Sequence, residues 1–162
     1  MDRIVVALLW FSALSSGVMA GIYFTFSVFV TRALDVLDGG SGIAAMQSIN
    51  RVILRSAFMP LFIGSSLACA ALVVIGLLRW SQPGAWQMAA GGAIYVLGML
   101  VVTMAANVPL NEALDRADPN GAGAMAAWGH FYQPWMAWNH VRTVACTLSM
   151  GLLVWSIAEQ AP

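Results

Sequence analysis

The sequence predicts an all-α integral membrane protein: a four-helix bundle with a short interfacial helix in each of its two longer loops. Two observations carry this prediction. Apolar residues make up 60% of the 162 residues and charged residues only 9%, whereas a soluble domain carries roughly 25% charged residues. The charges also bound four long charge-free runs, which are residues 4–31, 56–78, 80–111 and 143–158. We expect residues 1–162 to form one transmembrane domain.

A helix needs about 20 mostly apolar residues to cross the hydrocarbon core of a bilayer. The first three runs are long enough, and the fourth is long enough only if it extends backward past Arg142 to about Trp138. Continuous apolar runs favour helices over the alternating strands of a membrane barrel. We therefore expect spanning helices at about 5–30, 59–78, 86–106 and 138–157.

The composition also excludes other classes of protein. Disorder requires low hydrophobicity and a high net charge, and nucleic-acid binding requires a basic face. Here seven basic residues balance seven acidic ones. A cleaved signal peptide ending near Ala20 is an alternative for the first helix, but the apolar run continues to Val30 without turning polar.

The distribution of arginine predicts the orientation in the membrane. The two longer loops and their edges hold more arginines than the opposite side, so the positive-inside rule places these loops in the cytoplasm and both termini outside. We expect the plasma (inner) membrane of a bacterium. The loop arginines are Arg32, Arg51, Arg55, Arg116 and Arg142, against Arg3 and Arg79.

The first long loop begins with glycines around Ser41, a possible N-cap, and predicts a helix over residues 43–55. An interfacial helix whose arginines reach the lipid headgroups explains Arg51. It does not explain Gln47 and Asn50, which share that helix face. These two amides are therefore candidate ligand contacts.

The second long loop follows helix 86–106. Pro109 disfavours the α conformation at Val108, so we expect the chain to bend there and a short separate helix to run to about Ala117. Asn107 is placed to cap the break, and Asn111 lies at the same depth. Capping explains one asparagine better than two.

A polar and aromatic stripe leads into the fourth helix. Its members fall within about 80° of arc on a continuous helix. One interpretation is an aromatic belt with an arginine that reaches the headgroups. The other is a binding pocket, because a lone charge about one turn inside the span needs a partner or a ligand. The stripe consists of Trp128, Tyr132, Trp135, Asn139, Arg142 and Cys146.

Helix 5–30 carries a second stripe, made of Ser12, Ser16, Tyr23 and Ser27, which we expect to face the bundle interior. Hydrogen bonds between helices account for the serines, and Tyr23 remains a candidate ligand contact. The GxxxG motif at 17–21 favours close packing within the bundle over a homo-oligomer, which stays an alternative.

The sequence contains no metal motif. His130 and His140 are ten residues apart and do not project from one helix face, and Cys69 and Cys146 form no cluster with them. We expect no metal and no cofactor. Haem held by the two histidines is an alternative. His140, next to Asn139, is the candidate general base.

Three segments together resemble the anthrone-oxygenase-like family of small membrane proteins. They are Met46-Gln47-x-Ile49-Asn50, Asn107-Val-Pro-Leu-Asn111 and Trp135-x-x-Trp138-Asn139-His140-Val141-Arg142-Thr143, and the resemblance covers about residues 17–155. It implies a four-helix membrane protein. Fungal members oxidise anthrones to anthraquinones without metal or flavin. The resemblance implies importance for Asn50, Asn107, Asn111, Trp138, Asn139 and Arg142.

This chemistry needs an aromatic-lined pocket, donors for an enolate oxygen and a base. We expect Arg142, Asn139, Asn107 and His140 to act in catalysis, on a hydrophobic aromatic molecule and molecular oxygen. A non-enzymatic small-molecule binder or partner subunit, and a haem or quinone redox protein, remain alternative functions. The expected substrate contacts are Trp135, Trp138, Tyr23, Asn50, Gln47, Asn111, Trp128 and Tyr132.

Overall fold

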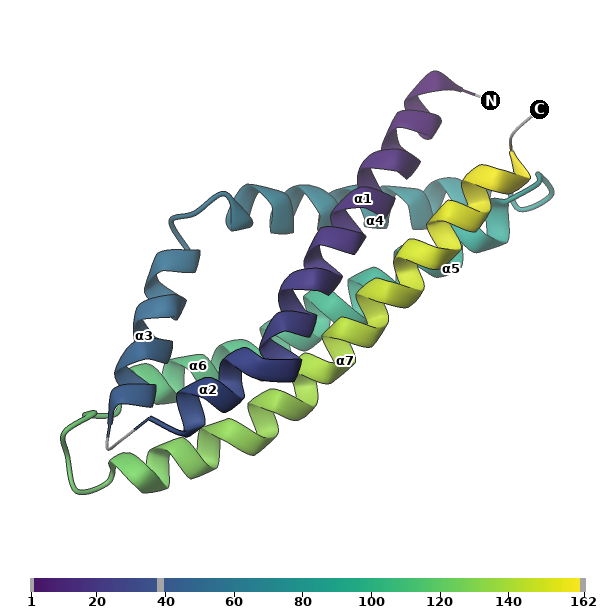
Figure 1. Ribbon diagram of the computed structural model, residues 1–162. Helices are drawn as coiled ribbons and strands as arrows, with labels where there is room; N and C mark the ends of the chain where they lie inside the picture. Colours follow the sequence, from purple (N-terminus) through teal and green to yellow (C-terminus); the bar gives the residue numbers. More distant parts are fainter. Residues whose placement is uncertain (1, 38–39, 161–162) are drawn as a thin grey trace.

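The computed structural model describes residues 2–37 and 40–160, which form helices joined by turns, with no strand among them. Four helical segments are long and apolar enough to cross a membrane, which confirms the predicted helical membrane bundle. In Figure 1 the two termini lie at one end of the bundle, and α2, α3 and α6 lie at the other. The four spans are Arg3–Asp35, Phe58–Leu78, Ala85–Asp115 and Ala124–Glu159.

The first span is longer than the predicted helix. It consists of α1 (Arg3–Thr25), a π-helical segment (Phe26–Val30) and α2 (Thr31–Asp35). The hydroxyl of Thr31 donates to the carbonyl of Phe26, at 2.6 Å. This bond spans five residues and matches the wider π-helical turn.

The third span corrects the prediction of a bend and a separate interfacial helix after residue 106. Helical dihedral angles continue from α5 (Ala85–Tyr95) through two π-helical segments (Val96–Val101 and Thr103–Asn107) into α6 (Val108–Asp115). The α-helical pattern starts anew at Val108, so Pro109 lies in a first turn, where its missing N–H is tolerated. Asn107 stands at the N-cap position of α6, but its side chain makes no capping hydrogen bond there.

The fourth span is also longer than predicted, because α7 (Ala124–Glu159) is continuous and contains Pro134. At 1.5 Å per residue, its 36 residues extend about 54 Å, which exceeds the hydrocarbon core of about 30 Å. The charge-free run therefore underestimated the length of this helix. Continuity places Trp135, Asn139 and Arg142 on one buried face.

The predicted helix in the first long loop is confirmed as α3 (Ser41–Ile53), although Gly40 precedes it as the N-cap and Ser41 is its first residue. Gln47, a residue of α3, donates from its side-chain Nε2 to the carbonyls of Leu114 and Ala117, both at 2.9 Å. These bonds hold α3 against the end of α6.

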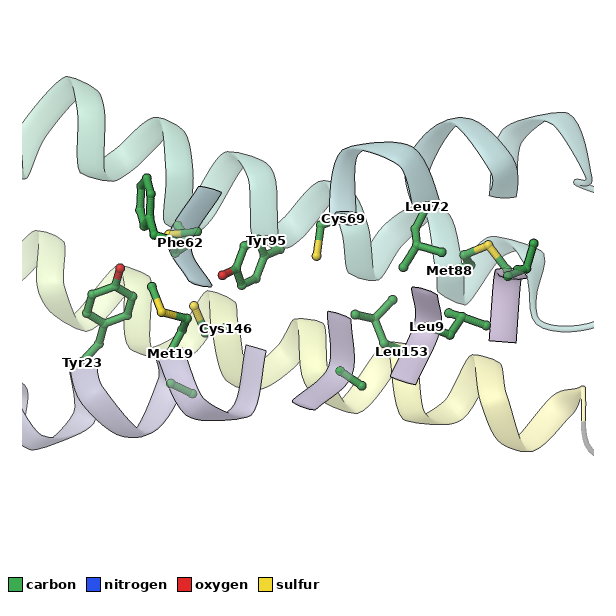
Figure 2. Close-up of a cluster of buried hydrophobic side chains, with 14 residues drawn as sticks. Leu9, Met19, Tyr23, Phe62, Cys69, Leu72, Met88, Tyr95, Cys146 and Leu153 are labelled. Atoms are coloured by element: carbon green, nitrogen blue, oxygen red, sulfur yellow. The ribbon is translucent and has the colours of Figure 1, made fainter. Parts of the chain in front are cut away.

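Close packing of α4 (Phe58–Leu78) on α5 depends on small residues. A Cβ added at Gly92 would collide with the carbonyl of Cys69 and with Val73. Gly84, in the turn between the two helices, has φ +75°, a conformation that favours glycine. Figure 2 shows the hydrophobic cluster that these helices form with α1 and α7, from Leu9 and Leu153 to Tyr23.

Candidate functional site

A cavity of about 310 Å³ lies between α1, α3, the start of α4, the third span and α7. This volume is at the lower end of the range for small-molecule pockets, roughly 300–1,000 Å³. The walls are mostly apolar and combine aromatic, thioether and aliphatic side chains. The apolar lining includes Ile22, Phe26, Met46, Ile49, Phe58, Met59, Phe62 and Met104, and the remaining wall includes Tyr23, Asn50, Thr103, Asn111, Trp135 and Arg142.

The guanidinium of Arg142 is buried in the wall of this cavity, with only 5% of the residue exposed. Its Nη2 donates to Asn139 Oδ1 at 2.7 Å, and its Nη1 donates to Thr103 Oγ1 at 3.4 Å. The guanidinium carbon lies 4.2 Å from the ring centroid of Tyr23 and 5.3 Å from that of Trp135. These rings stabilise the cation by cation–π contact.

Among the described residues, no carboxylate pairs with this arginine. In residues 2–37 and 40–160, the ion pairs join Arg51 to Asp115 and Arg116 to Glu112, both on the exposed surface. The cation at Arg142 is therefore buried without a counter-charge from the described chain. An unpaired buried charge is costly, and inside a membrane protein it indicates a functional site.

Asn139 holds the arginine in place. Its Nδ2 donates to the carbonyl of Tyr23 at 2.8 Å and to Ser27 Oγ at 2.7 Å, while its Oδ1 accepts from Arg142. Ser27 belongs to the π-helical segment Phe26–Val30, and Thr103 begins another. Such segments are frequent at functional sites. Here both supply a hydroxyl to the network around Arg142.

Trp135 is fixed by two asparagines of the third span. Its indole Nε1 donates to Asn111 Oδ1 at 2.8 Å, and its carbonyl accepts from Asn107 Nδ2 at 3.2 Å. Phe26, the first residue of the π-helical segment after α1, contacts the indole, with ring centroids 5.8 Å apart. The indole therefore forms a rigid wall of the cavity, and Asn107 lies behind it.

Three lining residues carry a buried polar atom without a hydrogen-bond partner in the described chain: the Tyr23 hydroxyl, Asn50 Nδ2 and Arg142 Nε. Each unsatisfied buried group costs about 1–3 kcal/mol. A ligand oxygen placed among them would offset part of that cost. In Figure 2 the Tyr23 hydroxyl points away from α1, toward the side on which Phe62 lies.

Several predicted site residues lie elsewhere. His140 is exposed and Trp138 is 44% exposed, so neither lines the cavity. Trp138 and His140 directly precede and follow Asn139 in the sequence. One step along a helix rotates the side-chain direction by about 100°, so neither shares the buried face of Asn139. The structure therefore brings no imidazole to Arg142. His130, the other histidine, is also exposed.

The remaining aromatic candidates pack through Phe131 against Trp135, outside the cavity. Trp128 packs against Tyr132, with centroids 5.9 Å apart, and donates from Nε1 to Asp35 at 2.7 Å. Gln47 is buried but binds backbone carbonyls. None of these three residues lines the cavity. The structure brings together Tyr23, Asn50, Asn111, Trp135 and Arg142, with Asn139 behind them.

Sequence reasoning missed Thr103 and the apolar walls from α4. Thr103 is a polar residue within a long apolar run, four residues before Asn107, so the two lie on one helix face. That spacing was a usable signal. Phe58 and Phe62 carry no comparable signal, because many phenylalanines in this chain face outward.

A shallower depression of about 340 Å³ adjoins the cavity between α3 and α6. Asn50 and Asn111 line both spaces. The outer part is lined by charged residues, where Arg51 and Asp115 pair at 3.0 Å. The cavity thus adjoins the polar end of the bundle through two amide side chains.

Comparison with known proteins gives one family. Residues 50–152 match the family described as anthrone oxygenase. No curated protein and no solved structure matches the chain. The matched region contains Asn50, Thr103, Asn111, Trp135 and Arg142, which are most of the polar wall of the cavity.

Proposed function

The chain belongs to the anthrone oxygenase family, and from this premise we propose that it is a cofactor-independent oxygenase of hydrophobic aromatic substrates. The proposed site is the cavity lined by Trp135 and Arg142. One observation carries the proposal: a buried guanidinium without a counter-charge in the described chain faces an aromatic-lined cavity.

The proposed reaction converts an activated benzylic CH₂ group to a carbonyl. Loss of one proton gives an enolate, whose carbon adds molecular oxygen and becomes a hydroperoxide after protonation. Loss of water then breaks the O–O bond and the second C–H bond. The balance is R₂CH₂ + O₂ → R₂C=O + H₂O, so no further reductant is consumed.

The residues of the cavity suit the charges that this reaction develops. Arg142 would stabilise the enolate oxygen, because a positioned donor in a water-poor site lowers the energy of a developing anion. Tyr23 and Asn50 would supply further donors to the bound substrate, because their donors have no partner in the described chain. Trp135 would stack on the flat substrate, and Asn139 would act as a positioning residue for the guanidinium.

The proposed location is the plasma membrane of a bacterium, with the two longer loops in the cytoplasm. The arginines of these loops support that orientation through the positive-inside rule. Oxygen and polycyclic aromatic substrates both dissolve in a bilayer, so a membrane site meets them at raised concentration. Labelling of single cysteines introduced at Asn120 and Arg79 in intact cells would test the orientation.

Oxygen uptake by the purified protein in nanodiscs, with an anthrone added, tests the proposed function. We expect turnover by the native chain and its loss in Arg142→Ala. The matched control is Arg79→Ala, which removes a half-buried arginine just after the end of α4, outside the cavity. Retained turnover in a folded Arg142→Ala protein would refute the assignment of this site.

A second candidate function is binding of an aromatic molecule without turnover. It is favoured by the lining of the cavity, which in the described chain includes no carboxylate and no imidazole to act as a base. The same assay separates the two functions. A protein that binds the anthrone tightly, yet leaves the rate of oxygen uptake at that of empty nanodiscs, is a binder.

A further inference from the structure

We propose that the cavity takes its aromatic ligand as a monoanion, a phenolate or an enolate, whose charge is the counter-ion that Arg142 lacks. This inference rests on the proposed function for the choice of an aromatic ligand. It adds the charge state in which that ligand is bound. It also implies that the proton of the substrate is lost to water and not to a side chain of the cavity.

The first step of the argument is the charge around Arg142. The helices packed against it contribute phenol, amide, hydroxyl, thiol and apolar groups, none of which carries a negative charge near neutral pH at its ordinary pKa. The cavity thus holds one positive charge, and one negative charge on the ligand would neutralise it. The groups are Tyr23 from α1, Asn50 from α3, Phe62 from α4, Thr103 from the third span, and Asn139 and Cys146 from α7.

The second step concerns the carboxylates of the adjoining depression. Glu112 and Asp115 line the adjoining depression but not the cavity. Asp115 pairs with Arg51 at 3.0 Å, and Glu112 lies 3.8 Å from Arg116. Both carboxylates are exposed to solvent and each has an arginine partner, so their negative charges are already compensated. They leave the charge of Arg142 to be matched by the contents of the cavity.

The third step is the lack of hydrogen-bond partners for three donors of the cavity wall. Arg142 Nε, the Tyr23 hydroxyl and Asn50 Nδ2 belong to lining residues and have no partner in the described chain. Charge-assisted hydrogen bonds are about twice as strong as neutral ones. One oxyanion is therefore a better partner for these donors than the carbonyl of a neutral quinone.

The fourth step is the shape of the body attached to that oxygen. The rest of the lining includes the rings of Phe26, Phe58 and Trp135 and thioethers such as that of Met46. Aromatic faces favour a flat conjugated ring system. Conjugation also delocalises the anion, which lowers the cost of removing it from water. A flat phenolate or enolate satisfies both requirements.

Absorbance of 2-hydroxyanthraquinone bound to the protein in nanodiscs tests the inference, because the phenol and the phenolate of this probe differ in colour. We expect the bound probe to ionise at least one pH unit lower than in empty nanodiscs, which is a tenfold preference for the anion. Arg142→Gln should abolish this shift, Arg142→Lys should keep part of it, and the control Arg79→Gln should keep all of it.

An unchanged ionisation midpoint for the probe bound to the native protein would overturn the inference, as would tighter binding of unsubstituted anthraquinone than of the ionised probe. A thermal unfolding curve establishes that each variant is folded. The probe has no reactive CH₂ group, so the result does not depend on turnover. A retained shift without oxygen uptake would refute only the proposed function, and uptake without a shift would refute only this inference.

Discussion

Asn139 is the residue whose removal should most clearly reveal how the arginine is held. Asn139→Ala removes two donated hydrogen bonds, to the Tyr23 carbonyl and to Ser27, and the acceptor of the bond from Arg142. A neutral hydrogen bond contributes about 0.5–1.5 kcal/mol and one to a charged group about 1.5–3 kcal/mol. Hydrogen bonds between membrane helices average nearer 0.6 kcal/mol.

The expected loss in the free energy of unfolding is therefore about 2–6 kcal/mol, with the lower figure set by the membrane value. Reversible unfolding in mixed micelles, followed by circular dichroism, measures it. The control is Asn120→Ala, in an exposed turn, which should change stability by no more than about 0.5 kcal/mol. A loss below about 1 kcal/mol for Asn139→Ala would refute the reasoning.

Three further predictions concern the cavity and the packing around it. Asn50→Asp places a carboxylate in the cavity wall, so it should weaken binding of an ionised hydroxyanthraquinone by about tenfold or more. Absorbance titration measures this binding, and equal or tighter binding would contradict the prediction. Gly92→Ala should destabilise the protein by about 1–3 kcal/mol through overpacking. The control Gly129→Ala should not, because nothing lies within 4 Å of the added Cβ. Equal melting temperatures of the two variants would contradict the packing described. His140→Gln should leave anthrone-dependent oxygen uptake within about twofold, because His140 lies outside the cavity; a large loss would restore the histidine as the base.

The number of spans and the inward face of α7 could be predicted from the sequence, because both depend on local patterns. Charges are rare enough to mark the ends of the apolar runs. The spacing of Trp135, Asn139 and Arg142 places them on one face of any continuous helix. Burial of Arg142 followed from its position inside the length that a span requires.

The wrong predictions have a common cause. Each feature depends on the conformation or packing of neighbouring segments, which a local sequence pattern does not contain. Pro109 indicates a break when the preceding turn is α-helical, but the π-helical segment Thr103–Asn107 lets the helix continue. His140 and Trp138 belong to the same motif as Asn139, yet the orientation of α7 turns both outward. The apolar wall from Phe58 and Phe62 depends on where α4 packs, which no local pattern encodes.

A structure determined with bound 2-hydroxyanthraquinone, in a crystal or by electron cryomicroscopy, tests most directly the claim that the cavity beside Arg142 is the functional site. The account predicts density between Trp135 and Tyr23, with the phenolate oxygen about 2.7–2.9 Å from Arg142 Nε. Density only at the exposed surface, or a guanidinium turned outward to lipid headgroups with the cavity closed beneath it, would contradict the account.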